Sequence, residues 1–184
     1  MRILGVDPGS VRTGYGCIES FGSRHRVVDC GAVTLAASLS FSEKLMKIHT
    51  ALSDLLSRHQ PDAMAVEDLF HAKNARSALK LGHVRGVVLL AGSQAGIPIA
   101  EYTATEVKRA VVGYGRAEKQ QVQQMVALLL ELDKAPSPLD VSDALAVAVC
   151  HAHAQGAVQD ELDKSPKAPR SWRRYRTSPP GSRS

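Results

Sequence analysis

The stretch RILGVDPGSVRTGYGCIES, residues 2–20, predicts a strand and the turn that ends it. A short apolar run at its start favours a buried strand. Pro8 lacks the amide hydrogen that a sheet ladder needs and Gly9 permits a turn, so we expect the strand to end at Asp7. The Asp7 carboxylate would then lie at the tip of a rigid strand. Taken alone, such an aspartate could simply cap the turn.

The segments that follow alternate between strand and helix patterns. Segments rich in β-branched residues and interrupted by glycine predict two more strands, which the turn FGSR joins. After them, segments with helical periodicity alternate with short apolar runs that predict strands. The expected strands are residues 2–7, 13–21, 25–34, 62–67 and 97–102, and the expected helices are residues 42–59, 74–96, 103–112, 118–131 and 141–156. This order predicts an α/β fold whose mixed sheet has three antiparallel strands first and parallel strands after them.

Three local features of the helices carry expectations of their own. Ser42 is a candidate N-cap for the first helix, and Asp140 is one for the last. Gly82 and Gly86 lie inside a predicted helix, where each costs about 1 kcal/mol relative to alanine. We therefore expect these two glycines to pack closely against another backbone.

The composition describes a globular domain. The chain has 184 residues, 44% of them hydrophobic and 22% charged, which is enough for one domain with its own core. No apolar run reaches the roughly 18 residues of a membrane span, and no signal peptide is visible, so we expect a cytoplasmic protein. Cys17, Cys30 and Cys150 lack metal-ligand spacing and are expected to be free thiols.

The formal net charge of +5 is unevenly distributed. Residues 164–184 hold seven Lys and Arg and no acid, which leaves residues 1–163 with a net charge of −2. Pro, Ser and Arg dominate the end of the chain, so we expect a folded domain over residues 1–158 and a disordered basic tail over residues 159–184. Residues 70–119 are also basic and could bind a polyanion, although such charges could equally serve solubility.

Three further carboxylates could join Asp7. Glu67 ends a predicted strand just as Asp7 does, and parallel neighbours would present both groups at the same edge of the sheet. Asp140 and Asp143 are three residues apart, on one face of the first turn of an otherwise apolar helix. That helix must pack on the sheet, so its two carboxylates could meet the other pair.

Four carboxylates in one place would repel one another and raise each other's pKa unless a cation were present. Oxygen ligands without a Cys or His motif favour Mg²⁺ or Mn²⁺. Two such ions, about 4 Å apart, could activate water and stabilise the leaving oxygen of a phosphodiester. The alternative is that each acid serves alone, as a turn cap, a strand-end charge, a helix cap or a charge at a helix N-terminus.

Four stretches of the chain resemble motifs of the RuvC family of Holliday-junction resolvases. They are ILGVDPGSVRTGYG (3–16), AVEDLFHAKNARSALKLGHVRG (65–86), EVKRAVVGYGRAEKQQVQ (106–123) and DVSDALAVAVCHAH (140–153). The resemblance implies a ribonuclease-H-like fold, with a five-stranded mixed sheet flanked by helices, and a homodimer. It also implies symmetric nicks in two opposing strands of a four-way DNA junction, made during recombination and repair.

The resemblance assigns roles to individual residues. The metal-binding catalytic set would be Asp7, Glu67, Asp140 and Asp143, with two Mg²⁺ ions that Mn²⁺ could replace. A metal-activated water would cut the phosphodiester and leave 5′-phosphate and 3′-hydroxyl ends. Lys119 would lie beside the scissile phosphate and Lys108 would contact the DNA backbone, whereas without the resemblance both would be solvated helix lysines.

Further DNA contacts are expected in the loop after Glu67 and the helix behind it. Phe70 would stack on bases splayed at the junction centre, with a core position in the turn as the alternative. The side chains that would follow phosphates are Lys73, Asn74, Arg76 and Lys80. The basic tail could add nonspecific contacts to DNA or a partner. A branch-migration complex of RuvA and RuvB is a partner that only the resemblance implies.

Other interpretations remain open at this point. The opening stretch also resembles the glycine-rich phosphate loop of actin-like kinases and ATPases, but the chain lacks room for the second domain that those proteins need. A noncatalytic DNA-binding protein could keep the same fold, although four acids in a DNA groove would repel phosphates. Ribonuclease-H-like enzymes that act on RNA–DNA hybrids or transposon ends are a closer alternative.

Overall fold

The computed structural model of the chain describes residues 1–68 and 74–164. Its elements follow in the order β1 (Arg2–Asp7), β2 (Arg12–Phe21), β3 (Arg24–Thr34), α1 (Phe41–His59), β4 (Ala63–Asp68), α2 (Ala75–Gln94), β5 (Ile99–Thr103), α3 (Ala104–Val112), α4 (Lys119–Leu129) and α5 (Leu139–Lys164). Every strand and helix predicted from the sequence is present.

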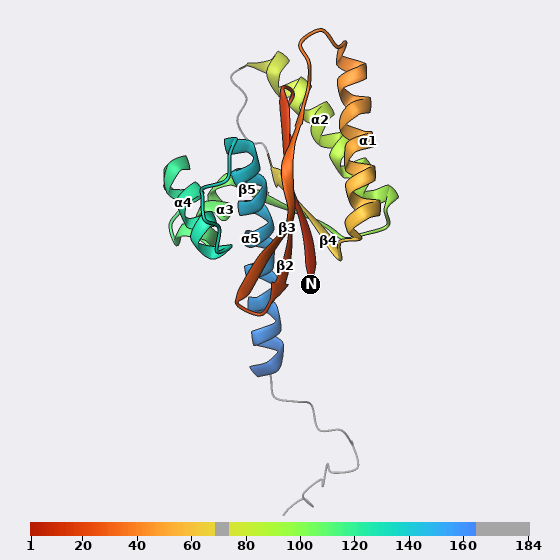
Figure 1. Cartoon of the computed structure of the whole chain (residues 1–184). Coiled ribbons are helices and arrows are strands. Elements are labelled where there is room, and N and C mark those ends of the chain that lie inside the picture. The colour runs from red at the N-terminus through yellow and green to blue at the C-terminus, as the bar shows by residue number, and fades with distance from the viewer. Residues whose placement is uncertain (69–73, 165–184) are drawn as a thin grey trace, which may run out of the picture.

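The five strands form one mixed sheet in the order β3-β2-β1-β4-β5 (Figure 1). The pairs β1–β2 and β2–β3 are antiparallel, whereas β1–β4 and β4–β5 are parallel. The prediction of three antiparallel strands followed by parallel strands is therefore confirmed. Because β1 lies at the centre of the sheet, the strand that ends at Asp7 has a neighbour on each side, which holds its tip in place.

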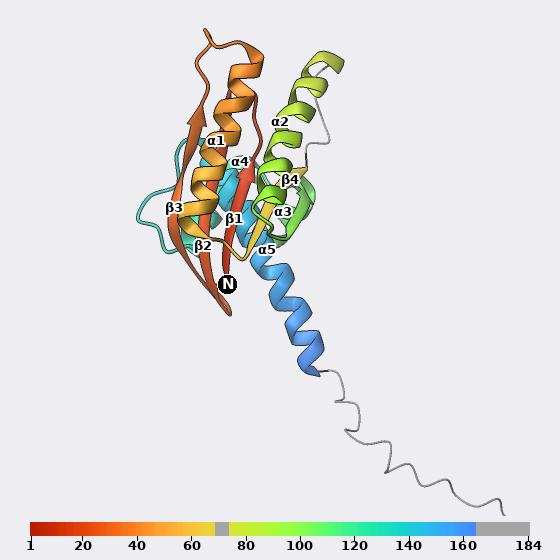
Figure 2. The same ribbon diagram turned by 90° about the vertical axis from the view of Figure 1, so that its right-hand side faces the viewer.

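Two layers of helices cover the sheet, with α1 and α2 on one face and α3, α4 and α5 on the other (Figures 1 and 2). Side chains of β1 alternate between the two cores, so Ile3 packs on the α5 side while Leu4 and Val6 pack on the α1 side. All three are fully buried, and burial of each contributes about 1.5–3 kcal/mol relative to exposure.

Two glycines let α5 lie directly on β1 and β2. A Cβ atom at Gly5 would lie 2.1 Å from the carbonyl oxygen of Ala144, and one at Gly14 would lie 1.9 Å from the carbonyl oxygen of Asp140. Any side chain at either position would therefore push the helix off the sheet. Residues 144–150 of α5 are buried, which confirms that the apolar helix packs on the sheet.

α5 is longer than the sequence pattern predicts. It was expected over residues 141–156 but runs from Leu139 to Lys164, past the expected domain boundary at residue 158. Alanine, glutamate and leucine after Gly156 favour helix, which a search for apolar periodicity does not reveal. The rest of the expected tail, residues 165–184, lies outside the described residues. None of the helices in the described part of the chain is both long and apolar enough to cross a membrane.

Two local predictions about the helices are wrong. Ser40, not Ser42, caps α1, because its side chain accepts from the backbone amide of Glu43 and its own amide donates back to the Glu43 carboxylate. Gly82 and Gly86 of α2 face open space instead of another backbone, since a Cβ atom at either position would have nothing within 4 Å.

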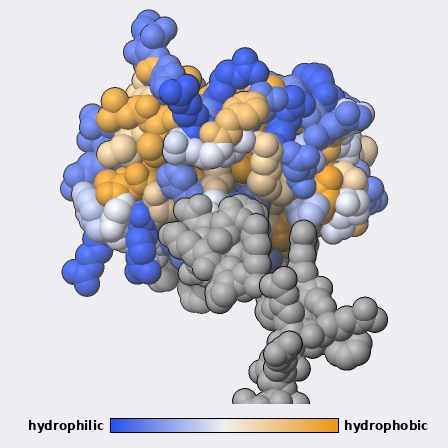
Figure 3. Space-filling model, turned by 90° about the horizontal axis from the view of Figure 1, so that it is seen from below, coloured by the Kyte–Doolittle hydropathy of each residue, from blue (hydrophilic) through white to orange (hydrophobic). Residues whose placement is uncertain are grey.

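Asp7 and the N-terminus lie at opposite ends of the sheet. β1 begins beside the N-terminus and ends at Asp7, so the strand tips of β1 and β4 point away from the turn that joins β2 to β3 (Figure 1). Seen from below, the N-terminal end of the molecule has apolar and hydrophilic residues interspersed over its surface (Figure 3).

Candidate active site

The two central strands bring Asp7 and Glu67 together. β1 and β4 are parallel neighbours in which Val6 pairs with Val66, so the next residue of each strand emerges at the same edge. Strand alternation places both side chains on the α5 side, because Ile3 and Ala65 of the same strands pack in that core. The predicted meeting of these two carboxylates is confirmed.

The pKa values of this pair show that both carboxylates are costly to ionise where they lie. Burial, followed by the negative charges of Glu67 and Asp143 and then of Asp140, raises the pKa of Asp7 to about 8. Burial also raises the pKa of Glu67. A bound cation would favour the ionised form of a carboxyl group that burial and neighbouring carboxylates hold in its neutral form.

The first turns of α5 supply Asp140 and Asp143. α5 begins at Leu139, so Asp140 is inside the first turn and is not the N-cap that the sequence suggested. The close approach of this turn to Gly14 seats Asp140 against β2. The i, i+3 spacing then places Asp143 on the same face, which confirms that the helix brings its two carboxylates to the strand tips.

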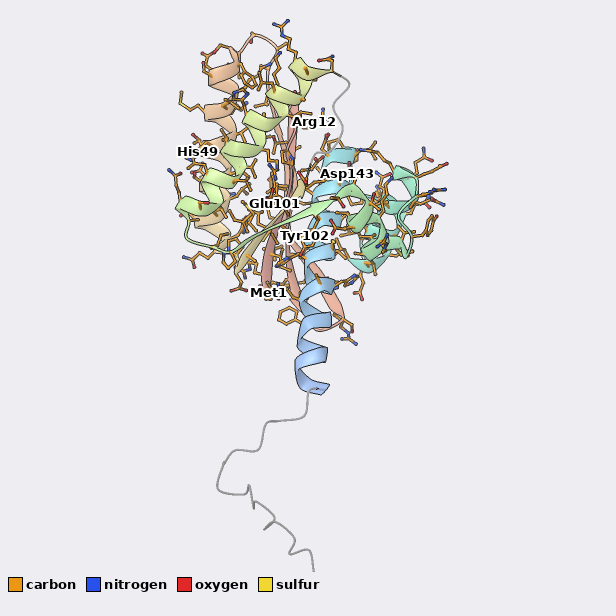
Figure 4. All side chains as sticks on the ribbon, turned by 180° about the vertical axis from the view of Figure 1, so that it is seen from behind. Met1, Arg12, His49, Glu101, Tyr102 and Asp143 are labelled. Carbon is orange, nitrogen blue, oxygen red and sulfur yellow. The ribbon has the colours of Figure 1, made fainter. Side chains whose placement is uncertain are left out.

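Each of these two carboxylates forms an ion pair with a basic side chain. Asp140 Oδ2 lies 3.2 Å from Arg12 Nη1, and Asp143 Oδ2 accepts a hydrogen bond of 2.8 Å from Lys119 Nζ. Figure 4 shows Arg12 and Asp143 near the same end of α5. The hydrogen bond to Asp143 is the main cause that raises the pKa of Lys119, so this lysine stays protonated.

A small cavity of about 110 Å³ opens beside two of the carboxylates. Its polar lining is Glu67, Asp143, Lys108 and Lys119, and its apolar lining comes from α3 and α4. We call Asp7, Glu67, Asp140 and Asp143 the acidic cluster. Lys108 of α3 and Lys119, the first residue of α4, thus face this cluster from the side away from Arg12. Two helices that lie far from Asp7 in the sequence therefore supply positive charge to its site.

The donor set fits a divalent metal ion that prefers oxygen ligands. Four carboxylates converge, and burial together with their mutual repulsion raises the pKa of Asp7. Among residues 1–68 and 74–164, no three His, Cys, Asp or Glu side chains are already arranged as metal ligands. Asp140 and Asp143 are instead each paired with a basic side chain.

The predicted DNA-binding residues other than Lys108 and Lys119 fall into three groups. Phe70 and Lys73 lie outside the described residues. Arg76 and Lys80 are exposed on α2. The Oδ1 atom of Asn74 caps α2 by accepting a 2.9 Å hydrogen bond from the amide of Ser77, so this side chain has a structural partner that the sequence interpretation did not include.

Sequence interpretation missed Arg12. The signal that could have found it is strand alternation: Ile18 is a core residue on the α5 face, and counting back by twos leads to Gly16, Gly14 and Arg12. A charged residue at the end of that row must emerge beside the first turn of α5. The position was overlooked because the proline and glycine that precede it suggested only a turn.

Comparison with known proteins identifies the family. The family model described as crossover junction endodeoxyribonuclease RuvC matches residues 3–151. A protein of Desulforamulus reducens with the same description is 53% identical over 152 residues, which cover 83% of this chain and 93% of the relative.

Solved structures give the same result. The Thermus thermophilus RuvC structure superposes with a TM-score of 0.79 at 34% identity and covers 86% of this chain and 97% of that one. A structure of T. thermophilus RuvC in complex with a Holliday junction substrate matches with a TM-score of 0.78 at 32% identity, over 84% of this chain and 95% of that one. The chain therefore belongs to the RuvC family of crossover junction endodeoxyribonucleases.

Proposed function

We propose that this protein is an endonuclease that resolves four-way (Holliday) DNA junctions by metal-dependent nicks in two opposing strands. The observation that carries the proposal is the convergence of Asp7, Glu67, Asp140 and Asp143 at the tips of the central strands, on a chain of the RuvC family. Lysines line the same site, so it combines metal-binding acids with groups that attract phosphate. A noncatalytic DNA-binding protein would have no use for the acids.

Nucleases of the RuvC family are metal-dependent. For this chain we propose two Mg²⁺ ions, replaceable by Mn²⁺, held by the four carboxylates. When bound, such ions lower the pKa of a water molecule and stabilise the leaving oxygen of the phosphodiester. The proposed products are a 5′-phosphate and a 3′-hydroxyl.

The basic residues of the site would act on the phosphate. Lys119 is protonated and already within reach of the acidic cluster, so it would offset the charge that develops on the scissile phosphate. Lys108, from the other side of the same cavity, would contact the DNA backbone. Neither role needs a covalent intermediate. Cys17 is fully buried and its pKa is raised to about 11 by burial, so it is a poor nucleophile.

The DNA contacts beyond the cleavage site are proposals from the sequence. Arg76 and Lys80 are exposed and would follow phosphates along α2. Phe70 and Lys73 keep their proposed contacts to the junction centre. We also propose that the residues after the nuclease domain add nonspecific electrostatic contacts, and that a branch-migration complex of RuvA and RuvB cooperates with the enzyme.

Two symmetric nicks require two active sites related by a two-fold axis, so we propose a homodimer. The face of α2 next to Leu45 is a suitable interface, because it forms an apolar groove of about 730 Å³. Leu79 and Leu90 of this groove are 65% and 50% exposed, and Gly82 and Gly86 would let a second helix approach closely.

A cleavage assay on a synthetic four-way junction tests the function. We expect Mg²⁺-dependent paired nicks by the wild type, and loss of nicking with retained junction binding in Asp7→Asn. Asp54→Asn makes the same charge change at an exposed position of α1 and should behave as the wild type.

Two outcomes would contradict the proposal. Junction binding without nicking, in Mg²⁺ and in Mn²⁺ and on several junction sequences, would indicate a noncatalytic DNA-binding protein. Faster cleavage of an RNA–DNA hybrid or a linear duplex than of the junction would indicate a different ribonuclease-H-like activity.

A further inference from the structure

We propose that Arg12 is a positioning residue that competes with the metal for Asp140 and passes to a DNA phosphate once the site is loaded. The inference rests on the proposed function and deepens it. It starts from the 3.2 Å contact between Arg12 Nη1 and Asp140 Oδ2. Among the described residues, Arg12 is the side chain that forms an ion pair with Asp140, as Lys119 does with Asp143.

The backbone of Arg12 is held rigidly at the site. The fully buried Thr13 donates a hydrogen bond of 3.1 Å to the carbonyl oxygen of Gly9, and the Val11 carbonyl oxygen accepts from the amide of Leu35 at 3.0 Å. The first contact ties the turn after Asp7 to the start of β2, and the second ties the residue before Arg12 to the residue that follows β3. Arg12 therefore projects from a fixed point toward the first turn of α5, which is how a residue that must meet one partner is best held.

The guanidinium group suits a transfer from carboxylate to phosphate. It stays charged at any physiological pH and offers planar pairs of donors that match both groups. The side chains of Arg12 and Asp140 are 38% and 34% exposed, so either can turn without disturbing the core. When Asp140 turns toward the metal site, Arg12 loses its partner beside a site that is expected to hold the DNA backbone.

Two consequences separate this role from a structural one. If Arg12 competes for Asp140, its removal should strengthen metal binding to the DNA-free protein, because a positive charge and a rival partner are both lost. If Arg12 then contacts a phosphate, its removal should reduce the salt dependence of junction binding by about one unit of slope. An arginine that merely braced α5 would leave the salt slope unchanged. Arg12→Lys, which keeps the charge, separates the loss of a rival partner from the loss of a positive charge.

The test measures Mn²⁺ binding to the full chain without DNA, by isothermal titration, and junction binding against salt concentration in Ca²⁺. For Arg12→Gln we expect Mn²⁺ to bind about three- to tenfold more tightly than to the wild type, together with a salt slope lower by about one. Arg12→Lys keeps the charge without the planar fork and should lie between them. Arg26→Ala, which removes another paired arginine at an exposed position of β3, should match the wild type in both assays.

The outcomes separate the two proposals. A wild type that binds no Mn²⁺, or an Asp7→Asn variant that binds it as well as the wild type does, would overturn the proposed metal site itself. If the wild type binds Mn²⁺ and needs Asp7 to do so, unchanged or weaker Mn²⁺ binding by Arg12→Gln would overturn the role of Arg12 alone. An unchanged salt slope would overturn the transfer to phosphate. A thermal melt in EDTA confirms that each variant is folded.

Discussion

At the scale of single residues, the fold itself places carboxylates that repel one another in one site. Asp7 is carried to its place by a buried strand, and there it meets three other carboxylates. Burial and these carboxylates make Asp7 costly to ionise and raise its pKa to about 8. The folded protein therefore holds a carboxyl group whose ionised form is unfavourable without a cation. Such perturbed groups are typical of sites that bind a cation.

The stability of the metal-free protein should fall as pH rises from about 4 to about 8. Between these values the folded protein keeps a proton on Asp7 that the unfolded chain has lost, because the pKa is raised from 3.8 to about 8. Asp7→Asn has no proton to lose. We expect this variant to be more stable than the wild type at pH 8, by on the order of 2 kcal/mol, and no more stable at pH 4.

Urea unfolding in EDTA at the two pH values measures this difference. Saturating Mg²⁺ should remove the advantage of Asp7→Asn, because a bound cation favours ionised carboxylates in the folded state. Asp54→Asn is the control for the loss of a charge. Equal stability differences at pH 4 and pH 8 would show that Asp7 titrates normally in the folded protein.

Loss of the Lys119 charge should slow the chemical step. We expect Lys119→Ala to reduce single-turnover nicking by about 10²- to 10³-fold, which is typical when one stabilising group of a transition state is removed. Lys119→Arg should restore part of the rate because it keeps the charge. Lys134→Ala, at an exposed position between α4 and α5, provides the matched control. Equal loss of rate in both alanine variants would leave Lys119 without a special role.

At the scale of elements, the position of α5 decides whether the site exists. Two of its carboxylates reach the strand tips only because the helix lies in direct contact with β1 and β2. The glycines of the opening stretch make this contact possible. The motif therefore has two functions, since Asp7 supplies a carboxylate and the glycines admit the helix that brings the others.

A methyl group at Gly5 should separate the helix from the sheet. The added Cβ would lie 2.1 Å from the Ala144 carbonyl oxygen, a clash with backbone that no side-chain rotation relieves. We expect Gly5→Ala to lower the free energy of unfolding by about 3 kcal/mol or more. Gly156→Ala, in α5 with nothing within 4 Å, should instead raise it by up to about 1 kcal/mol. Chemical denaturation checks both, and a neutral Gly5→Ala would contradict the described packing.

At the scale of the whole molecule, the two faces of the sheet carry different features. One face is covered by α1 and α2, and the other is covered by α5. The α5 face builds the site, whereas the α2 face leaves an apolar groove open to a partner. The two faces are separated by the sheet, so a change in the groove need not disturb the carboxylates. This separation allows the proposed dimer to be tested apart from the proposed chemistry.

A charge in the α2 groove should break the proposed dimer. Leu79→Glu places a carboxylate where two apolar surfaces would meet, so we expect a monomer by analytical ultracentrifugation and loss of paired nicking. Leu128→Glu makes the same change at a leucine of α4 that is 72% exposed, and it should leave the dimer intact. Two variants with the same sedimentation behaviour would exclude the α2 face as the interface.

The resemblance to the RuvC family assigns the four acids of the proposed site, whereas sequence patterns predict the order of strands and helices along the chain and the end of a strand at Asp7. Both of these predictions depend on local signals: Pro8 and Gly9 stop a strand at Asp7, and apolar periodicity separates helix from strand. Which charged side chains meet depends on the tertiary structure alone. The pairing of Arg12 with Asp140 and the open faces of Gly82 and Gly86 depend on how elements far apart in the chain are packed, and no local pattern records that packing.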